Sequence, residues 1–148
     1  MAKFASISDV RARVGGRAKG SLLSETTTPS TKDVGLWLDE GEAFVTTALD
    51  VGDIPHPEVN TAPSRLLRSW IADYASAHFR ASNAAAGGDS DNEDGEDLLE
   101  KFFSRIDDIY TNSTKYAAIL GGGSSTDAQK RIRTGPLVEP KFVSTEEF

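Results

Sequence analysis

Apolar side chains recur at three- and four-residue spacing along two long stretches of the chain, and this is the period of an amphipathic helix. In the first stretch the repeat consists of Val34, Trp37, Leu38, Gly41, Val45, Ala48 and Leu49. In the second it consists of Leu67, Trp70, Ile71, Tyr74, Ala75, His78 and Phe79. Ser30 or Thr31 can cap the first stretch, and Pro63 with Ser64 marks the start of the second. The pattern predicts two long helices joined by an extended, proline-rich connection.

A short helix is predicted before these two, over residues 7–14. Ser8 is a suitable N-cap, Asp9 follows it in the first turn, and glycines follow the last apolar residue. The next segment, residues 15–31, is rich in Gly, Ser and Thr and has little apolar periodicity. We therefore expect it to form a long loop.

A fourth helix is predicted to open near Glu96 or Asp97, because acidic side chains are favoured at the positive end of a helix. Its inward face is expected to consist of Leu99, Phe102, Phe103, Ile106, Ile109 and Tyr110. The pattern leaves open whether this helix continues to Leu120.

These elements predict an all-α fold, a small four-helix bundle with long loops, over residues 1–120. We expect Gly41 to lie on the packed face of its helix, where a glycine allows a neighbouring helix to approach closely. The residues predicted to form the core are Trp37, Leu38, Val45, Leu67, Trp70, Ile71, Tyr74, Phe102, Phe103 and Ile106.

Residues 121–148 differ in character and are predicted to form an extended C-terminal arm. The segment follows a run of glycines, has no helical period, and carries short apolar runs at 136–138 and 141–143. It is either a disordered terminus or an arm that pairs with a sheet edge on another chain. The residues expected to contact a partner are Arg131, Arg133, Pro136, Leu137, Val138, Phe142 and Val143.

The composition is that of a single soluble domain: 148 residues, of which 26% are charged and 38% hydrophobic. The absence of cysteine excludes disulfides, thiolate nucleophiles and sulfur-ligated metals. We expect no signal peptide and no membrane-spanning segment, because no stretch has the roughly 18–20 apolar residues that a spanning helix needs.

The net charge of -7 resides in one segment, because residues 89–100 hold seven acidic residues and no basic one. We expect an acidic loop over residues 87–97, formed by Asp89, Asp91, Glu93, Asp94, Glu96 and Asp97. Outside residues 89–100 the 16 basic residues are balanced by as many acidic ones. Basic residues gather near the N-terminus, at Lys3, Arg11, Arg13, Arg17 and Lys19, where they could meet passing nucleic acid or an acidic face of a partner.

The acidic segment partly matches a calcium-binding loop. Asp89, Asp91, Glu93 and Glu100 occupy positions one, three, five and twelve of the helix–loop–helix pattern. The turn glycine, however, is displaced by one place to Gly95. A solvated acidic loop is therefore favoured over a calcium site, and we predict no metal and no cofactor.

The sequence also indicates that the protein is not an enzyme. His56 and His78 are its only histidines, so a histidine-based metal triad is impossible, and no nucleophile-elbow or phosphate-loop spacing occurs. His56 is expected to be an exposed turn residue and His78 to lie at the margin of the core. Asp107 and Asp108 are adjacent on a helix and point about 100° apart, so they are expected to form a solvated face rather than a carboxylate pair.

In the order, length and character of its elements, the chain resembles the head–tail adaptor proteins of tailed bacteriophages, also called connector or head-completion proteins. The resemblance rests on the segments SDVRARVGG, DVGLWLDEGEAFVTTAL, PSRLLRSWIADYASAHFRAS and DLLEKFFSRIDDIY, followed by the arm. Residues 15–31 are longer than the simplest members need, and residues 87–97 are unusually acidic.

The resemblance implies a structural virion protein at the neck, assembled in the host cytoplasm. It implies a homo-oligomeric ring of about twelve copies beneath the portal protein, with the arm gripping the portal or neighbouring subunits. Such a ring continues the channel for DNA, which passes without sequence-specific binding, and docks a stopper or tail-completion protein. The alternatives are a monomeric helical interaction or regulatory domain with a disordered tail and, less favoured, an acidic-loop calcium sensor.

Overall fold

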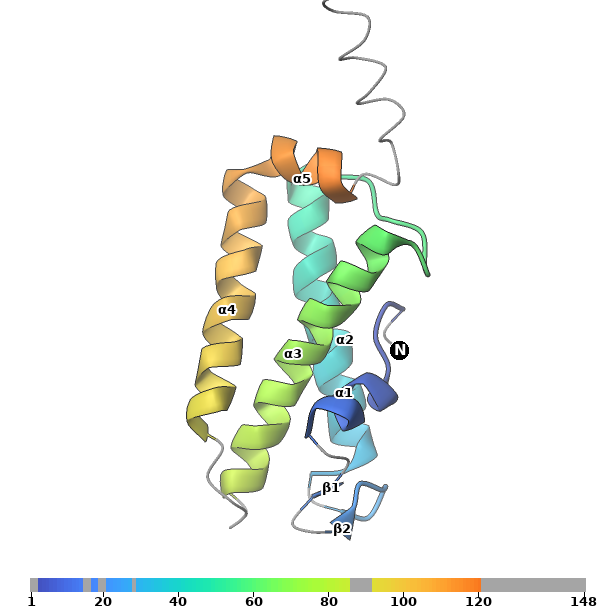
Figure 1. Cartoon of the computed structure of the whole chain (residues 1–148), viewed down its shortest axis with the longest axis vertical. Helices are drawn as coiled ribbons and strands as arrows, with labels where there is room; N and C mark the ends of the chain where they lie inside the picture. Colours follow the sequence, from blue (N-terminus) through green and yellow to red (C-terminus); the bar gives the residue numbers. More distant parts are fainter. Residues whose placement is uncertain (1–2, 15–16, 19–20, 28, 86–91, 121–148) are drawn as a thin grey trace, which may run out of the picture.

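The protein is an all-α bundle in which three long helices run side by side (Figure 1). The computed structural model describes residues 3–14, 17–18, 21–27, 29–85 and 92–120. Within these ranges the helices are α1 (Ile7–Val14), α2 (Thr31–Val51), α3 (Ala62–Ala85), α4 (Asn92–Thr111) and α5 (Ser113–Leu120). Helices α2 and α4 both pack on α3, α1 packs on α3 and α2, and α5 crosses one end of the bundle. The predicted all-α bundle is confirmed, with five described helices in place of four.

The segment expected to be a long loop contains a small antiparallel hairpin. Strands β1 (Arg17–Ala18) and β2 (Ser21–Leu22) have two residues each and pair between α1 and α2. Leu23 follows the hairpin and is buried in the core, which ties this segment to the helices. The predicted long loop thus contains a short hairpin and one core residue.

The prediction that Ser8 caps α1 was wrong, because the helix begins at Ile7 and therefore already includes Ser8. The backbone N–H and the hydroxyl of Ser6 donate to Oδ2 of Asp9 at 2.8 and 2.9 Å. The other oxygen of Asp9 accepts from Nε of Arg68 on α3 at 2.9 Å. Burial opposes ionisation of Asp9, but the hydrogen bonds from Arg68 and Ser6 outweigh it and lower the pKa of the carboxyl group. One carboxylate thus caps α1 and joins it to α3.

Helix α2 begins with a capping box, as the sequence indicates for Ser30. The backbone N–H of Asp33 donates to the Ser30 hydroxyl at 3.2 Å, and the Ser30 N–H donates to the Asp33 carboxylate at 2.8 Å. These hydrogen bonds from Ser30 lower the pKa of Asp33. Each of the two side chains thus accepts a hydrogen bond from a backbone N–H group that has no partner within the helix.

The core lies where the apolar stripes of the helices meet. The buried residues among those predicted are Leu38, Val45, Leu67, Trp70, Ile71, Tyr74, Phe102 and Ile106. Trp37 is only partly buried and packs at the margin of this core. Phe103 and Tyr110 were predicted to face inward, but their side chains are 41% and 43% exposed. Since Phe102, Ile106 and Ile109 occupy the inner face of α4, Phe103 and Tyr110 fall outside it.

A glycine sets the spacing between α2 and α3. A Cβ atom built on Gly41 would lie 3.0 Å from Cδ1 and 3.3 Å from Cγ of Tyr74. The Tyr74 ring therefore rests on the backbone of α2, as expected for a glycine on the packed face. Gly95 plays a similar part between α4 and α3, because its Cβ would lie 3.1 Å from the carbonyl oxygen of Ala77.

An ion-pair network joins α1, α3 and α4. Asp73 on α3 accepts from Nε of Arg13 at 3.0 Å and from Nη1 of Arg105 at 2.9 Å. Arg13 also donates to the hydroxyl of Ser69 at 3.2 Å, and Arg105 lies over the ring of Trp70. The carboxylate of Asp73 is the common acceptor, so it fixes three helices at one point.

The two glycines of α2 give a matched test of this packing. A Cβ on Gly35 meets nothing within 4 Å, whereas one on Gly41 meets the Tyr74 ring. Gly35→Ala should raise the free energy of unfolding by about 0.5–1 kcal/mol through helix propensity. Gly41→Ala should lower it by about 1 kcal/mol, because overpacking outweighs that gain. Urea denaturation measures both, and equal increases would show that α2 and α3 are not in this close contact.

Replacing the shared acceptor of the ion-pair network should destabilise the bundle. We expect Asp73→Asn to lower the free energy of unfolding by about 1–2 kcal/mol, a value reduced because both arginines are partly exposed to solvent. Asp107→Asn, at an exposed position of α4, is the control and should change it by less than about 0.5 kcal/mol. If the two variants unfold at the same urea concentration, the ion-pair network contributes nothing to the free energy of unfolding.

Candidate interaction surface

Aromatic rings from all three long helices form one continuous cluster that reaches the surface. Phe44 on α2 lies 5.8 Å from Tyr74 on α3 and 5.4 Å from Phe103 on α4, in edge-to-face contacts between ring centroids. Phe102 fills the interior between them, 4.8 Å from Tyr74 and 5.4 Å from Phe103. Phe44 and Phe103 are 38% and 41% exposed, so adjacent rings from two helices face solvent together.

The cluster continues along α2 and α3 through Trp37 and His78. Trp37 stacks on the His78 ring at 5.8 Å, and His78 contacts Tyr74 at 4.6 Å. We call the cluster of Trp37, Phe44, Tyr74, His78 and Phe103 the aromatic face; Tyr74 is buried in it, and the other four rings are partly exposed. Trp37 and Phe44 are seven residues apart and therefore lie two turns apart on the same side of α2.

Glu40 supplies the charge beside this face. Burial raises the pKa of Tyr74, and the hydrogen bond and negative charge of Glu40 raise it further. Burial lowers the pKa of His78, although the charge of Glu40 opposes that effect. At neutral pH both rings are consequently uncharged, and the aromatic face is suited to apolar contact with a protein.

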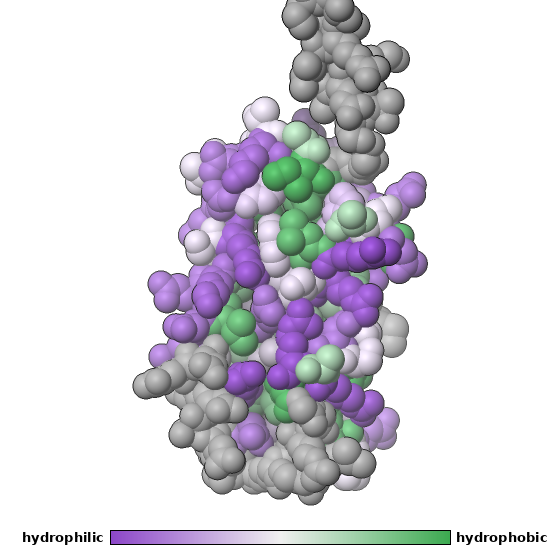
Figure 2. All heavy atoms as spheres, viewed as in Figure 1, coloured by the Kyte–Doolittle hydropathy of each residue, from purple (hydrophilic) through white to green (hydrophobic). Residues whose placement is uncertain are grey.

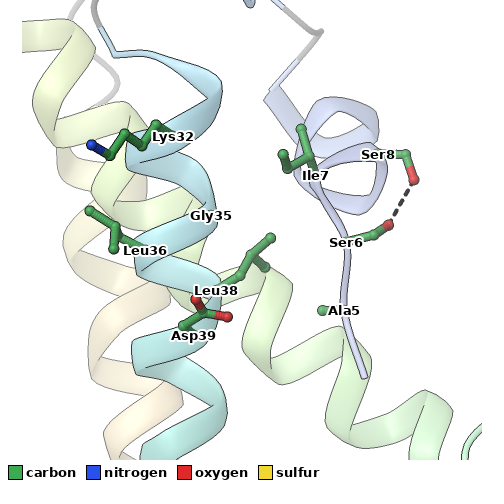
Figure 3. A pocket seen from close by; sticks show the side chains of 9 residues that line it. All are labelled: Ala5, Ser6, Ile7, Ser8, Lys32, Gly35, Leu36, Leu38 and Asp39. Carbon is green, nitrogen blue, oxygen red and sulfur yellow. Dashed lines mark hydrogen bonds between the residues drawn. The ribbon is translucent and has the colours of Figure 1, made fainter. Parts of the chain in front are cut away.

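A second feature is a groove between α2 and the segment that precedes α1 (Figure 3). The groove has a volume of about 610 Å³. Its lining residues are Ala5, Ser6, Ile7, Ser8, Lys32, Gly35, Leu36, Leu38 and Asp39. Leu38 projects from α2 toward this segment, and Figure 3 shows the segment running opposite the helix. The N–H groups of Lys3 and Phe4 donate to Glu42 on α2, which anchors this wall of the groove.

Other exposed apolar side chains are scattered over the bundle. Those at least 38% exposed outside the aromatic face are Leu36, Val51, Val59, Leu66, Tyr110 and Ile119. On the face in Figure 2, apolar residues lie in patches among hydrophilic ones, most visibly near the end of the bundle where α5 lies. Scattered exposure of this kind is usual, whereas the aromatic face brings its rings into contact.

The N-terminal basic residues that the structure describes make contacts within the fold. Arg13 binds Asp73 and Ser69, and Arg11 donates to the carbonyl oxygen of Leu23 at 2.9 Å. The side chains of Arg17 and Lys19 lie outside the described residues. The expectation that this patch meets nucleic acid or a partner is thus weakened, because at least two of its members hold α1 in place.

The expected acidic loop is shorter than residues 87–97, because α4 begins at Asn92. Glu93 and Asp94 belong to its first turn, and Glu96 and Asp97 follow as exposed helical residues. Asp89 and Asp91 lie outside the described residues. A helix over residues 92–100 also rules out the calcium loop, since its ligands at positions five and twelve would be separated by roughly 10 Å of helix.

Asp108 was expected on a solvated face but joins α4 to α5. It accepts from the Tyr116 hydroxyl and from the Asn112 amide, both at 2.6 Å. These hydrogen bonds lower the pKa of Asp108. His56, as expected, is exposed, and its Nε2 lies 2.7 Å from the Asp50 carboxylate. Within the described ranges no group of His, Asp or Glu side chains is arranged to hold a metal ion.

The residues expected on the arm fall in 121–148, outside the described residues: Arg131, Arg133, Pro136, Leu137, Val138, Phe142 and Val143. Sequence reasoning missed the groove and the exposure of Phe44. A signal was present for Phe44, which follows Gly41 by three positions and precedes the buried Val45. An apolar side chain at the edge of a stripe is the pattern of a residue shared between core and surface.

Comparisons with protein-family models, with curated proteins and with solved structures gave no match. Among the described helices, none combines the length and the apolar character needed to cross a membrane.

The burial of His78 predicts a pH dependence of stability. Its pKa in the folded protein lies below the ordinary histidine value of 6.5, so the native state binds fewer protons than the unfolded state. The stabilisation is present above pH 6.5 and is lost as the pH falls through the folded pKa. The free energy of unfolding should therefore decrease between about pH 7.5 and pH 5.5, above the range in which carboxylates titrate.

His78→Gln should remove most of this decrease, and His56→Gln, at an exposed position, should leave it intact. Urea denaturation at several pH values measures the effect. A decrease that persists unchanged in His78→Gln would contradict the assignment.

Proposed function

We propose that this chain is a structural subunit of a tailed-bacteriophage head–tail adaptor, a homo-oligomeric ring that sits beneath the portal protein. In that role it continues the DNA channel without reading sequence and offers a surface to a stopper or tail-completion protein. It belongs to the neck of the virion and assembles in the host cytoplasm.

The aromatic face is the observation that carries the proposal. Phe44 and Phe103 are in mutual contact, are exposed from different helices, and rest on a buried aromatic core. Aromatic side chains are enriched at protein interfaces because they combine a large contact area with few rotatable bonds. In a permanent assembly, a neighbouring subunit would cover these exposed rings.

The placement of α1 and α4 supports a ring in particular. A closed ring of identical subunits needs two different surfaces on each copy, one that contacts the next subunit and one that contacts the previous. Helix α4 lies on one side of α3 and α1 on the other (Figure 1). The aromatic face includes a residue of α4 and none of α1, so the two sides of the bundle offer different surfaces for such contacts.

The chemistry of the described residues also favours an assembly role. Their charged side chains serve as caps and as links between helices, as Asp9, Asp73 and Asp108 illustrate. The exposed acids at the start of α4 would repel the DNA backbone if that end faced the channel, which favours sliding over binding.

The proposal predicts that the aromatic face is needed for assembly on the portal. Purified full-length chain, mixed with the portal protein encoded nearest to it in its genome, should form a complex whose mass corresponds to several copies per portal ring. The double variant Phe44→Ser/Phe103→Ser should bind at least about tenfold more weakly, because apolar area is lost from the interface. Leu66→Ser is the control, since Leu66 is as exposed as Phe44 but lies outside the aromatic face.

Mass photometry measures the complex, and circular dichroism with thermal melting establishes that each variant is folded. A wild-type chain that remains a monomer beside the portal, and a chain lacking residues 134–148 that behaves identically, would contradict the adaptor role. Those results would favour the monomeric interaction domain instead.

A further inference from the structure

The groove between α2 and the segment before α1 has an apolar floor and open space above it. Ala5 and Leu38 form the floor and are 6% and 2% exposed. Over Gly35 a Cβ atom would meet nothing within 4 Å, while Leu36 at the outer edge is 58% exposed. Because Phe4 is tied to Glu42 at 3.0 Å, the wall facing α2 is fixed and the groove is preformed.

The chain carries a segment of matching character beyond the described residues. Residues 136–143 read Pro-Leu-Val-Glu-Pro-Lys-Phe-Val. In an extended chain alternate side chains share a side, so Val138, Pro140 and Phe142 would form an apolar edge about 14 Å long. Lys32 and Asp39, which bound the groove along α2, are seven residues apart, or about 10 Å along a helix. The apolar edge is therefore comparable in length to the groove.

The same chain can reach the groove. Helix α5 ends at Leu120, at the end of the bundle where α2 also ends (Figure 1). From Val51 to Leu36 the distance along α2 is about 22 Å. The 16 residues between Leu120 and Leu137 can span up to about 50 Å when extended. Residues 121–136 are therefore long enough to let residues 136–143 reach the groove. Their covalent connection also keeps that segment at a high effective concentration near the groove.

Charge favours the same occupant. The groove bears Lys32 at one end, and the segment carries Glu139 next to its apolar edge. In a segment that runs parallel to α2, Glu139 would lie nearer the Lys32 end of the groove and Lys141 nearer the Asp39 end, both on the edge opposite the apolar one. This order of charges gives the segment a preferred direction.

We propose that the groove formed by residues 5–8 and the first half of α2 is an intramolecular docking site for residues 136–143 of the same chain. Val138, Pro140 and Phe142 lie over Ala5, Gly35 and Leu38, with Glu139 nearer the Lys32 end of the groove than Lys141. The inference does not depend on the adaptor role, because it concerns the chain alone.

The absence of cysteine allows a direct test by disulfide trapping in the full-length protein. The variant Gly35→Cys/Phe142→Cys places one thiol in the open groove and one on the segment. The control is Val51→Cys/Phe142→Cys, since Val51 is 68% exposed and lies on the same helix, at the end where the arm begins. Under a glutathione redox buffer, the initial rate of intramolecular disulfide formation should be at least about tenfold higher for the first pair.

The products separate on a non-reducing gel. Equal rates for the two pairs would overturn the docking site, because an undocked arm meets both positions. Dimers as the main product of the Gly35→Cys/Phe142→Cys variant would overturn the intramolecular assignment, since the occupant would then be a second copy of the chain.

Limited trypsin digestion tests the same site without added thiols. A docked segment is protected at Lys141, so cleavage there should be at least about tenfold slower than at Arg133 in the full-length chain. Gly35→Trp fills the groove and should abolish this protection, whereas Gly35→Ala should retain it. Thermal melting of both variants verifies the fold, and identical protection in Gly35→Trp and wild type would contradict the proposal.

Discussion

The contact between Gly41 and the ring of Tyr74 is the constraint on which the arrangement of the helices depends. Because Gly41 has no side chain, the Tyr74 ring lies directly on the backbone of α2, with Cδ1 only 3.0 Å from where a Cβ would stand. From this position Tyr74 contacts Phe44, Phe102 and His78, one partner on each of the three long helices. The aromatic face thus centres on one close approach, with Tyr74 held by the neighbouring rings and by its hydrogen bond with Glu40.

The same contact explains how polar and apolar functions are divided over the bundle. Where α1 meets α3, Asp9 and Asp73 accept hydrogen bonds from arginines and hold the two helices together. On the side of α4, Phe44 and Phe103 remain open to solvent. The contact of α1 with α3 is held by ion pairs, whereas α2 and α4 expose aromatic rings. The bundle therefore has two unlike sides, which a ring of identical subunits requires.

The sequence predicted the long helices well because their signals are local. The start of α2 follows from Ser30 and Asp33, and the close approach at Gly41 follows from a glycine within an apolar stripe. Apart from the N-cap of α1, the predictions that were wrong concern contacts between elements. The start of α4 at Asn92 depends on Gly95 lying against Ala77 of α3, and neither local charge nor propensity reports that contact. Phe103 lies one position from the inner face of α4, and only the placement of α2 decides that its ring remains partly exposed. The groove was not predictable because it is formed by residues 5–8 and α2, which adjoin only after folding.

Hydroxyl-radical footprinting of the full-length chain, alone and mixed with the portal protein proposed as its partner, reports the exposure of individual aromatic rings and so tests whether the aromatic face is an interface. Oxidation of Phe44 and Phe103 should fall at least about fivefold on assembly, as expected for rings buried in an interface. Tyr110, which is 43% exposed on α4 but outside the aromatic face, serves as the internal reference. Unchanged oxidation of Phe44 and Phe103 in an assembled complex would contradict the claim that the aromatic face is the surface through which this protein assembles.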